Sequence, residues 1–230
     1  MSVNLKKYQE SMIKKNCPND CTFSLAKLRH IELAIVPPPE EIVGIIISRD
    51  PTVAWHYFYE FSKREKLRRN FLFVSAIPLA FLTKISIFMD DMINKENNIT
   101  KDDRQLLFEV ILNKTYWTHL HKCFTNTKFN YSKFNNSNAK KCANTWLKDE
   151  LDKAIGLKTR FLITLGNDVE NWINSWKELR DIEVIDFIHP SNQNNRYWYR
   201  SSKEKPIFEI IQKTERNLIR LIEICRTINK

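Results

Sequence analysis

The sequence has few glycines and no long apolar run, and each scarcity excludes a class of protein. Three glycines and eight prolines in 230 residues exclude a collagen-like or low-complexity chain. The longest apolar stretch, 71–82, is interrupted by Ser75 and Pro78 and is shorter than the roughly 20 residues that a membrane-spanning helix needs. The first 15 residues carry four lysines and no apolar signal core. We therefore expect a cytoplasmic, intracellular protein without a membrane partner.

Acidic residues are also in the minority. The chain has 37 Lys and Arg against 27 Asp and Glu, which gives a net charge of +10. Hydrophobic residues make up 43% and aromatic residues 12% of the chain, enough to build a packed core. No linker or internal repeat divides it, so we expect one domain over residues 1–230. The basic excess favours a polyanionic partner such as a nucleic acid.

Five cysteines stand in a chain that we expect to fold in a reducing compartment. Disulfide frameworks are rare in such compartments. Metal ligation, redox chemistry and simple burial remain as alternatives for these thiols.

Strand-like segments alternate with helix-like segments along the chain. The run 42–47 is apolar on both faces, as in a central parallel strand. Further strands are expected at 115–120, 161–165 and 183–188. Helices are expected at 5–15, 53–69, 79–93, 102–112, 139–154, 168–176 and 205–228, and a polar loop at 124–138. This alternation predicts an α/β fold: three α/β/α layers around a mainly parallel sheet of about four strands.

Ionisable residues follow several of the predicted strands. Asp50, His119, His121 and His189 all lie at or just beyond a strand end. Ligands of open parallel sheets bind beyond the carboxyl ends of the strands, so we expect these four residues to gather at one edge. Taken singly, an aspartate before a proline is also an ordinary turn residue, and a lone histidine often has no special role.

Five segments in these regions carry a resemblance. They are Ile-Ile-Ile-Ser-Arg-Asp-Pro-Thr at 45–52, Thr-His-Leu-His-Lys-Cys at 118–123, a cysteine-containing helix at 142–151, Phe-Leu-Ile-Thr-Leu-Gly at 161–166 and His-Pro-Ser at 189–191. Their order and content resemble the motifs of the uracil-DNA glycosylase superfamily, in particular its iron–sulfur branch. The match extends over most of the chain, except for 54–113.

The resemblance implies roles for individual residues. Asp50 would stabilise the positive charge that develops on the sugar and would orient water, and His189 would donate to the leaving base. His119 stands where the family has an asparagine that reads the edge of uracil. The residues that would contact the base and the DNA are Ser48, Arg49, Pro51, Thr52, Phe71, His119 and Ser191.

Three positions depart from the family pattern. Ser48 replaces the usual glycine, and Asp50 stands where the iron–sulfur branch usually has alanine, although another branch has aspartate there. His119 replaces the asparagine, and a neutral imidazole offers one donor and one acceptor in a different geometry from an amide. This change favours a deaminated or modified base other than uracil.

Four cysteines match the cluster ligands of the iron–sulfur branch. Cys17 and Cys21 form a C-x3-C pair, and Cys123 and Cys142 follow in the second and third motifs. The resemblance implies a [4Fe–4S] cluster with a structural role. Four thiolates also suit zinc, and four buried thiols without metal are a third possibility. Cys225, on the apolar side of the last helix, is expected in the core.

The sequence thus predicts a monomeric DNA glycosylase of base excision repair that acts on single- or double-stranded DNA. The alternatives are a non-catalytic or altered-specificity nucleic-acid-binding protein of the same fold, a metal-binding or redox protein unrelated to DNA, and a basic interaction protein. Tyr197, Trp198 and Tyr199 are candidates for base stacking or for core packing. Candidates for a basic DNA-binding face are Lys122, Lys140, Lys141, Arg196 and Arg200.

Overall fold

The computed structural model describes residues 2–17, 21, 35–51, 72–73, 76–94, 98–123, 135–176, 179, 182–198 and 205–228. The helix expected at 53–69, most of the loop expected at 124–138, and the candidate site residues Thr52 and Phe71 lie outside these ranges. Tyr199 and Arg200 lie outside them as well.

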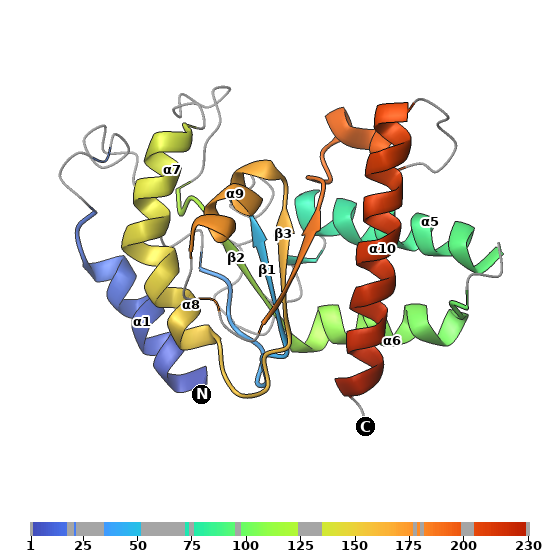
Figure 1. Cartoon of the computed structure of the whole chain (residues 1–230). Coiled ribbons are helices and arrows are strands. Elements are labelled where there is room, and N and C mark those ends of the chain that lie inside the picture. The colour runs from blue at the N-terminus through green and yellow to red at the C-terminus, as the bar shows by residue number, and fades with distance from the viewer. Residues whose placement is uncertain are drawn as a thin grey trace.

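A four-stranded parallel sheet forms the centre of the molecule (Figure 1). Its strands are β1 (Gly44–Ser48), β2 (Thr115–His119), β3 (Phe161–Leu165) and β4 (Glu183–Phe187), in the order β2-β1-β3-β4. All three neighbouring pairs are parallel. This confirms the predicted sheet, and every residue of β1, β2 and β3 is buried, as expected for strands covered on both faces.

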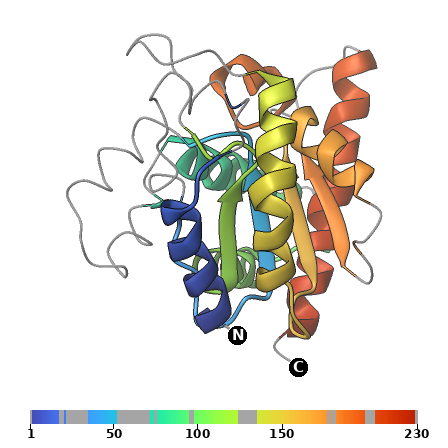
Figure 2. The same cartoon turned by 90° about the vertical axis from the view of Figure 1, so that its left-hand side faces the viewer.

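Helices cover both faces of the sheet. One layer holds α1 (Ser2–Lys14) and a continuous helical segment formed by α7 (Asn136–Cys142), η3 (Ala143–Leu147) and α8 (Lys148–Ala154). The other holds α5 (Ala76–Asn94), α6 (Lys101–Lys114) and α10 (Lys205–Ile228). Figure 2 shows α1 and the α7–α8 segment in front of the sheet. The three-layer α/β/α prediction is therefore confirmed. The remaining described elements are α9 (Asn167–Ser175) and the 3₁₀ turn η4 (Asn192–Tyr197).

The two faces of β2 point into different layers because side chains alternate along a strand. Trp117 packs edge-on against Phe81 of α5, with the ring centroids 6.3 Å apart. The hydroxyl of Tyr116 faces the opposite layer, where Gln9 of α1 donates to it at 2.8 Å. By the same alternation, His119 shares the face of Trp117, and Thr118 shares the face of Tyr116.

The segment after β2 differs from the prediction. A helix was expected at 139–154, but α7 already begins at Asn136, within the expected loop, because the Asn135 side chain caps it by accepting from the Asn138 amide at 3.1 Å. The helix then widens into a π-helical turn at η3 before α8. Such turns are rare and are often found at functional sites.

Among the helices within the described ranges, none has both the length and the apolar character required to cross a membrane.

Candidate functional site

The loops after β1 and β2 remain paired beyond the ends of their strands. The Leu120 amide donates to the Ser48 carbonyl at 2.8 Å, and the His121 amide donates to the Arg49 carbonyl at 2.9 Å. Ser48 and His119 are also directly paired in the register of the two strands. The structure therefore brings together the first two motifs found in the sequence.

Asp50 lies in this edge with only 10% of its side chain exposed. Its carboxylate accepts from the Arg49 guanidinium at 2.7 Å. The charge of Asp50 acts on both His121 and His189, raising the pKa of each imidazole against the effect of burial. Asp50 and His189, which the sequence places 139 positions apart, therefore lie within electrostatic range of each other at one edge of the sheet.

The segment His189-Pro190-Ser191 is held in place from several sides. The Asn194 side chain donates to the His189 carbonyl at 2.9 Å. Behind the imidazole, Gly166 adopts φ 92°, and a β-carbon at that position would be 3.0 Å from the His189 β-carbon. Only glycine fits there without strain, because a side chain at this φ is unfavourable and would press on His189.

Lys84 of α5 is a site residue that the sequence reasoning missed. Its ammonium group donates to the carbonyl oxygens of Pro190 at 2.8 Å and Ser191 at 3.1 Å. The side chain is buried, and burial lowers its pKa. The signal was present in the sequence, because Lys84 is the one charged residue within the stretch 76–89.

His189 is neutral at physiological pH. Burial lowers the pKa of its imidazole to about 4, assisted by the positive charges of Arg49 and Lys84 and opposed by the negative charges of Asp50 and Asp168. A neutral imidazole carries a single N–H group, so it can donate one hydrogen bond without bringing a positive charge.

His119 is buried at the end of β2 and is also neutral. Burial lowers the pKa of its imidazole well below the ordinary range, and the nearby charge of Lys122 lowers it further. Its Nδ1 atom lies 2.8 Å from the Ser48 hydroxyl, which also accepts from the indole N–H of Trp117 at 3.1 Å. The Nε2 atom has no hydrogen-bond partner within the described part of the chain.

The aromatic residues near the sheet edge differ in burial, with Phe73 and Trp198 in the core and Tyr197 only partly covered. Phe73 packs edge-on against Trp117, with ring centroids 6.4 Å apart, on the sheet face that also carries His119. Trp198 is 2% exposed and stacks on Phe187 of β4. The stacking role considered for Trp198 is therefore wrong, because its ring is part of the core. Tyr197 is half-buried, and the Arg196 guanidinium lies over its ring at 4.8 Å.

A second region lies beside this edge. The four cysteines singled out in the sequence line one pocket, together with His121 and Trp146. His121 was predicted at the sheet edge, whereas Trp146 was not singled out in the sequence. The full lining consists of Cys17, Cys21, His121, Cys123, Asn138, Lys141, Cys142 and Trp146. His121 connects the two regions. Its Nδ1 atom forms a hydrogen bond with the Cys123 carbonyl at 2.8 Å, and the charge of Asp50 raises the pKa of its imidazole.

Within this pocket, the Lys122 backbone amide donates to the Cys142 sulfur at 3.3 Å. The pKa of the Cys142 thiol is raised to about 12, mainly by burial and with a smaller contribution from the neighbouring Cys17 and Cys21. Among the residues that the structure describes, no three His, Cys, Asp or Glu side chains converge closely enough to hold a single metal ion. The thiols therefore surround a shared space without meeting at one point.

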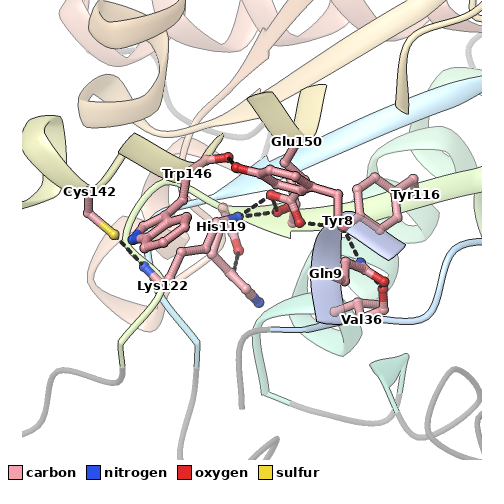
Figure 3. A network of polar contacts seen from close by, with 11 residues as sticks. Tyr8, Gln9, Val36, Tyr116, His119, Lys122, Cys142, Trp146 and Glu150 are labelled. Atoms are coloured by element: carbon pink, nitrogen blue, oxygen red, sulfur yellow. Dashed lines mark hydrogen bonds and ion pairs between the residues drawn. The ribbon is translucent and has the colours of Figure 1, made fainter. Parts of the chain in front are cut away.

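A buried polar network lies behind the pocket (Figure 3). Lys122 forms an ion pair with Glu150 of α8, and both side chains are 1% exposed. Thr118 donates to the Glu150 carboxylate at 2.8 Å, and Tyr116 donates to it at 2.6 Å. Lys122 was expected on a DNA-binding face. That prediction is wrong, because its side chain turns inward to neutralise Glu150.

The same network ties the N-terminal helix to the other elements. Tyr8 of α1 donates to the Trp146 carbonyl at 2.9 Å, and Gln9 donates to the Val36 carbonyl at 3.0 Å and to the Tyr116 hydroxyl. Figure 3 shows α1, β2 and the α7–α8 segment meeting around these side chains. Lys140 and Lys141 of α7 remain exposed.

The sheet edge combines a largely buried carboxylate with two neutral imidazoles and a loop held by a buried lysine. Such a set can stabilise a developing cation on one side and hydrogen-bond a polar ring on the other.

Comparison with known proteins identifies no family for this chain. No protein-family model matches it, and neither does any curated protein.

Proposed function

We propose that this protein is a DNA glycosylase that removes a deaminated, uracil-like base from DNA. The observation that carries the proposal is that a carboxylate and an imidazole from distant motifs, Asp50 and His189, both follow strands of one parallel sheet directly beyond its carboxyl edge. The ordered motifs that resemble the uracil-DNA glycosylase superfamily support the same reaction.

The reaction begins with a flipped nucleotide, because a stacked base is not accessible inside a duplex. The bond between the sugar C1′ and the base nitrogen breaks, and its electron pair leaves with the base. The Asp50 carboxylate stabilises the resulting sugar cation and orients a water molecule toward C1′. The water oxygen bonds to C1′, and the released proton passes to the departing base through solvent.

His189 acts on the other product of bond cleavage. Negative charge develops on a base oxygen, and the N–H group of a neutral imidazole can stabilise it by donating a hydrogen bond. The low pKa of His189 suits this role, because burial disfavours the charged imidazolium and keeps the ring neutral. Lys84 is a positioning residue, since it holds the loop through the Pro190 and Ser191 carbonyls.

The four cysteines fit a [4Fe–4S] cluster. They line one pocket, and a backbone amide already points at the Cys142 sulfur. The indole N–H of Trp146 is buried in the pocket lining and lacks a partner within the described residues, so it is suited to donate to a sulfur of the cluster. Figure 3 shows this indole beside Cys142.

Zinc, the alternative, fits less well. Zn–S bonds of about 2.3 Å require four thiolates to converge on one point. No three potential ligand side chains in the described ranges do so. When bound, the cluster would cross-link the segment after α1 to the start of α7, and its binding energy would contribute to folding.

The cluster proposal predicts a specific spectroscopic result. Cys142→Ala should reduce the iron content and the visible absorption of protein purified without oxygen, and Cys225→Ala should not. Cys225 is the matched control because it is a buried cysteine in α10, outside the pocket. Wild-type protein that holds neither iron nor zinc after anaerobic purification would refute the proposal.

The glycosylase proposal is tested with oligonucleotides that contain uracil, hypoxanthine, xanthine or methylated bases, in single and double strands. Wild-type protein should release at least one deaminated base. Asp50→Asn should abolish release, and His189→Ala should lower it about 10²–10³-fold, the usual cost of losing such a donor. Asp102→Asn, an exposed carboxylate at the start of α6, should have no effect.

The non-catalytic alternative predicts a different outcome. A protein that binds these oligonucleotides in a salt-sensitive manner but releases no base would be a binding protein of this fold. The observation that favours this alternative is the burial of His119 in place of the family's asparagine. Failure to bind DNA at low salt would overturn both proposals.

A further inference from the structure

A hollow of about 260 Å³ lies at the amino edge of the sheet, opposite the edge that carries Asp50 and His189. It is formed by the residues before β1, the loop between α8 and β3, and the last turn of α10. Figure 1 shows the C-terminal end of α10 and the beginnings of the strands at the same, lower end of the molecule. The lining residues are Glu41, Val43, Lys158, Arg160, Thr227 and Ile228. This amino-edge hollow is therefore separate from the site proposed for base release.

The loop at 155–160, which forms one wall, is held in one shape by Thr159. This side chain is 3% exposed. Its hydroxyl donates to the Ile42 carbonyl at 3.2 Å and accepts from the Gly156 amide at 3.0 Å, and the Thr159 amide donates to the Gly156 carbonyl at 2.9 Å. The wall is therefore preformed, so a ligand does not have to order it on binding.

Positive charge predominates around the amino-edge hollow. Of its six lining residues two are basic and one is acidic. Lys158 forms an ion pair with Glu41. The hydrogen bond from Lys158 and, to a smaller extent, the charge of Lys114 lower the pKa of the Glu41 carboxyl. Three cations, Lys114, Lys158 and Arg160, thus lie around one carboxylate, and the excess charge favours an anionic ligand.

Arg160 has the form of an anion-binding group. One of its five N–H groups, on Nη1, donates to the Leu157 carbonyl at 2.8 Å and fixes the direction of the guanidinium. Within the described ranges no carboxylate pairs with this side chain. A guanidinium binds carboxylate or phosphate oxygens through two parallel hydrogen bonds, and Arg160 retains the N–H groups to do so.

The remaining walls limit the size and kind of ligand. Val43 is buried and Ile228 is half-buried, so they supply apolar surface. The Thr227 hydroxyl donates to the Ile224 carbonyl at 2.7 Å, which leaves its oxygen to accept from a ligand hydroxyl. Pockets for drug-sized ligands measure roughly 300–1,000 Å³, so this hollow suits a smaller molecule.

We propose that the amino-edge hollow binds a small phosphate monoester, with its phosphate oxygens on Arg160 and Lys158 and a hydroxyl of its carbon skeleton on Thr227. A phosphate carries nearly two negative charges at neutral pH and three acceptor oxygens, so it matches the excess of cations better than a single carboxylate does. The site goes beyond the proposed glycosylase function and does not depend on it. A bound ligand would join the end of α10 to the beginnings of β1 and β3 and so stabilise the native state.

Isothermal titration calorimetry on the whole chain tests the site, with glycerol phosphate as the probe at constant ionic strength. Wild-type protein should bind glycerol phosphate more tightly than inorganic phosphate, which lacks the hydroxyl, and more tightly than succinate. Arg160→Gln should weaken the binding about tenfold or more. Arg160→Lys should weaken it as well, because an ammonium group cannot bind two oxygens in parallel. Arg216→Gln, which removes an exposed arginine of α10 outside the hollow, should leave the affinity unchanged.

Three results would overturn the proposal. Wild-type protein shows no heat of binding with glycerol phosphate, Arg160→Gln binds it as tightly as wild-type protein does, or Arg216→Gln weakens binding to the same degree. The last result would indicate attraction by the net charge of +10 alone. If Arg160→Gln does not fold, Lys158→Gln takes its place, since it removes a cation and leaves Glu41 to repel the phosphate. Base release is not measured here, so either proposal can fail while the other stands.

Discussion

The buried ion pair between Lys122 and Glu150 gives the sharpest test of the structure. Lys122→Met keeps most of the side-chain volume but removes the cation. The Glu150 carboxylate then retains its hydrogen bonds from Tyr116 and Thr118 but has no opposite charge. Removing one partner of a buried pair costs about 3–5 kcal/mol, mostly because the remaining charge cannot regain its hydration.

The loss is measured by equilibrium unfolding in urea at pH 7. With a slope of about 2–3 kcal/mol/M for a chain of this size, the midpoint should fall by about 1–2 M. Adding Glu150→Gln to the same protein should recover part of the loss, because the neutral amide removes the unpaired charge, its oxygen can accept from one of the two hydroxyls, and its NH₂ group can donate to the oxygen of the other. Recovery in the double variant would show that the unpaired charge, and not lost packing, causes the damage.

An exposed ion pair provides the control. Lys213 of α10 pairs with Glu170 of α9 at 3.0 Å, and the lysine side chain is 48% exposed. Lys213→Met should cost less than about 1 kcal/mol because solvent screens the pair. A cost this small for Lys122→Met as well would contradict the burial of Lys122 and with it the network behind the cysteine pocket.

Three further predictions concern other parts of the fold. Gly44→Ala should lower the free energy of unfolding, measured in urea, by at least about 1–3 kcal/mol. A β-carbon at this position would lie 2.0 Å from the ring of Phe161 on β3. Gly166→Ala should lower base release about tenfold by displacing His189, and unchanged kinetics would show that the close approach is not maintained. Arg226 lowers the pKa of Asp103 to about 2, so this pair stabilises the native state above pH ~4, and the contribution is lost as the pH falls toward ~2. Asp103→Asn should therefore cost about 1–2 kcal/mol at pH 7 and much less at pH 2, where about half of the carboxyl groups are protonated in the native state, a difference that acid titration of both proteins would measure.

Hydrophobic periodicity located most of the described elements. The strand at 161–165 and the helix at 205–228 have the boundaries that the sequence predicted, and β1 differs from its predicted range by one or two residues. These segments were accessible because they are either apolar on both faces or strongly amphipathic, and such patterns directly reflect burial. The π-helical turn was not predicted, because it arises from how the α7–α8 segment fits against its neighbours.

The side chains of two lysines show the limit of sequence reasoning. Lys84 and Lys122 look like surface residues by type, yet both are buried. Their burial is possible only because distant acceptors converge on them, carbonyls of the His189-Pro190-Ser191 segment in one case and the Glu150 carboxylate in the other. Nothing local in the chain reveals a partner that lies 28 or more positions away.

The order of residues alone determined the alternation of strands and helices, and hence the parallel sheet, since local periodicity reports which faces are buried. It also supplied the ionisable groups at the strand ends. Only the tertiary structure decided that Asp50 and His189 act on each other, that four thiols share a pocket and that His119 is paired to Ser48 and Trp117. Those relations depend on how the parallel strands pair in register and how the helices pack against them, which brings together residues that are far apart along the chain.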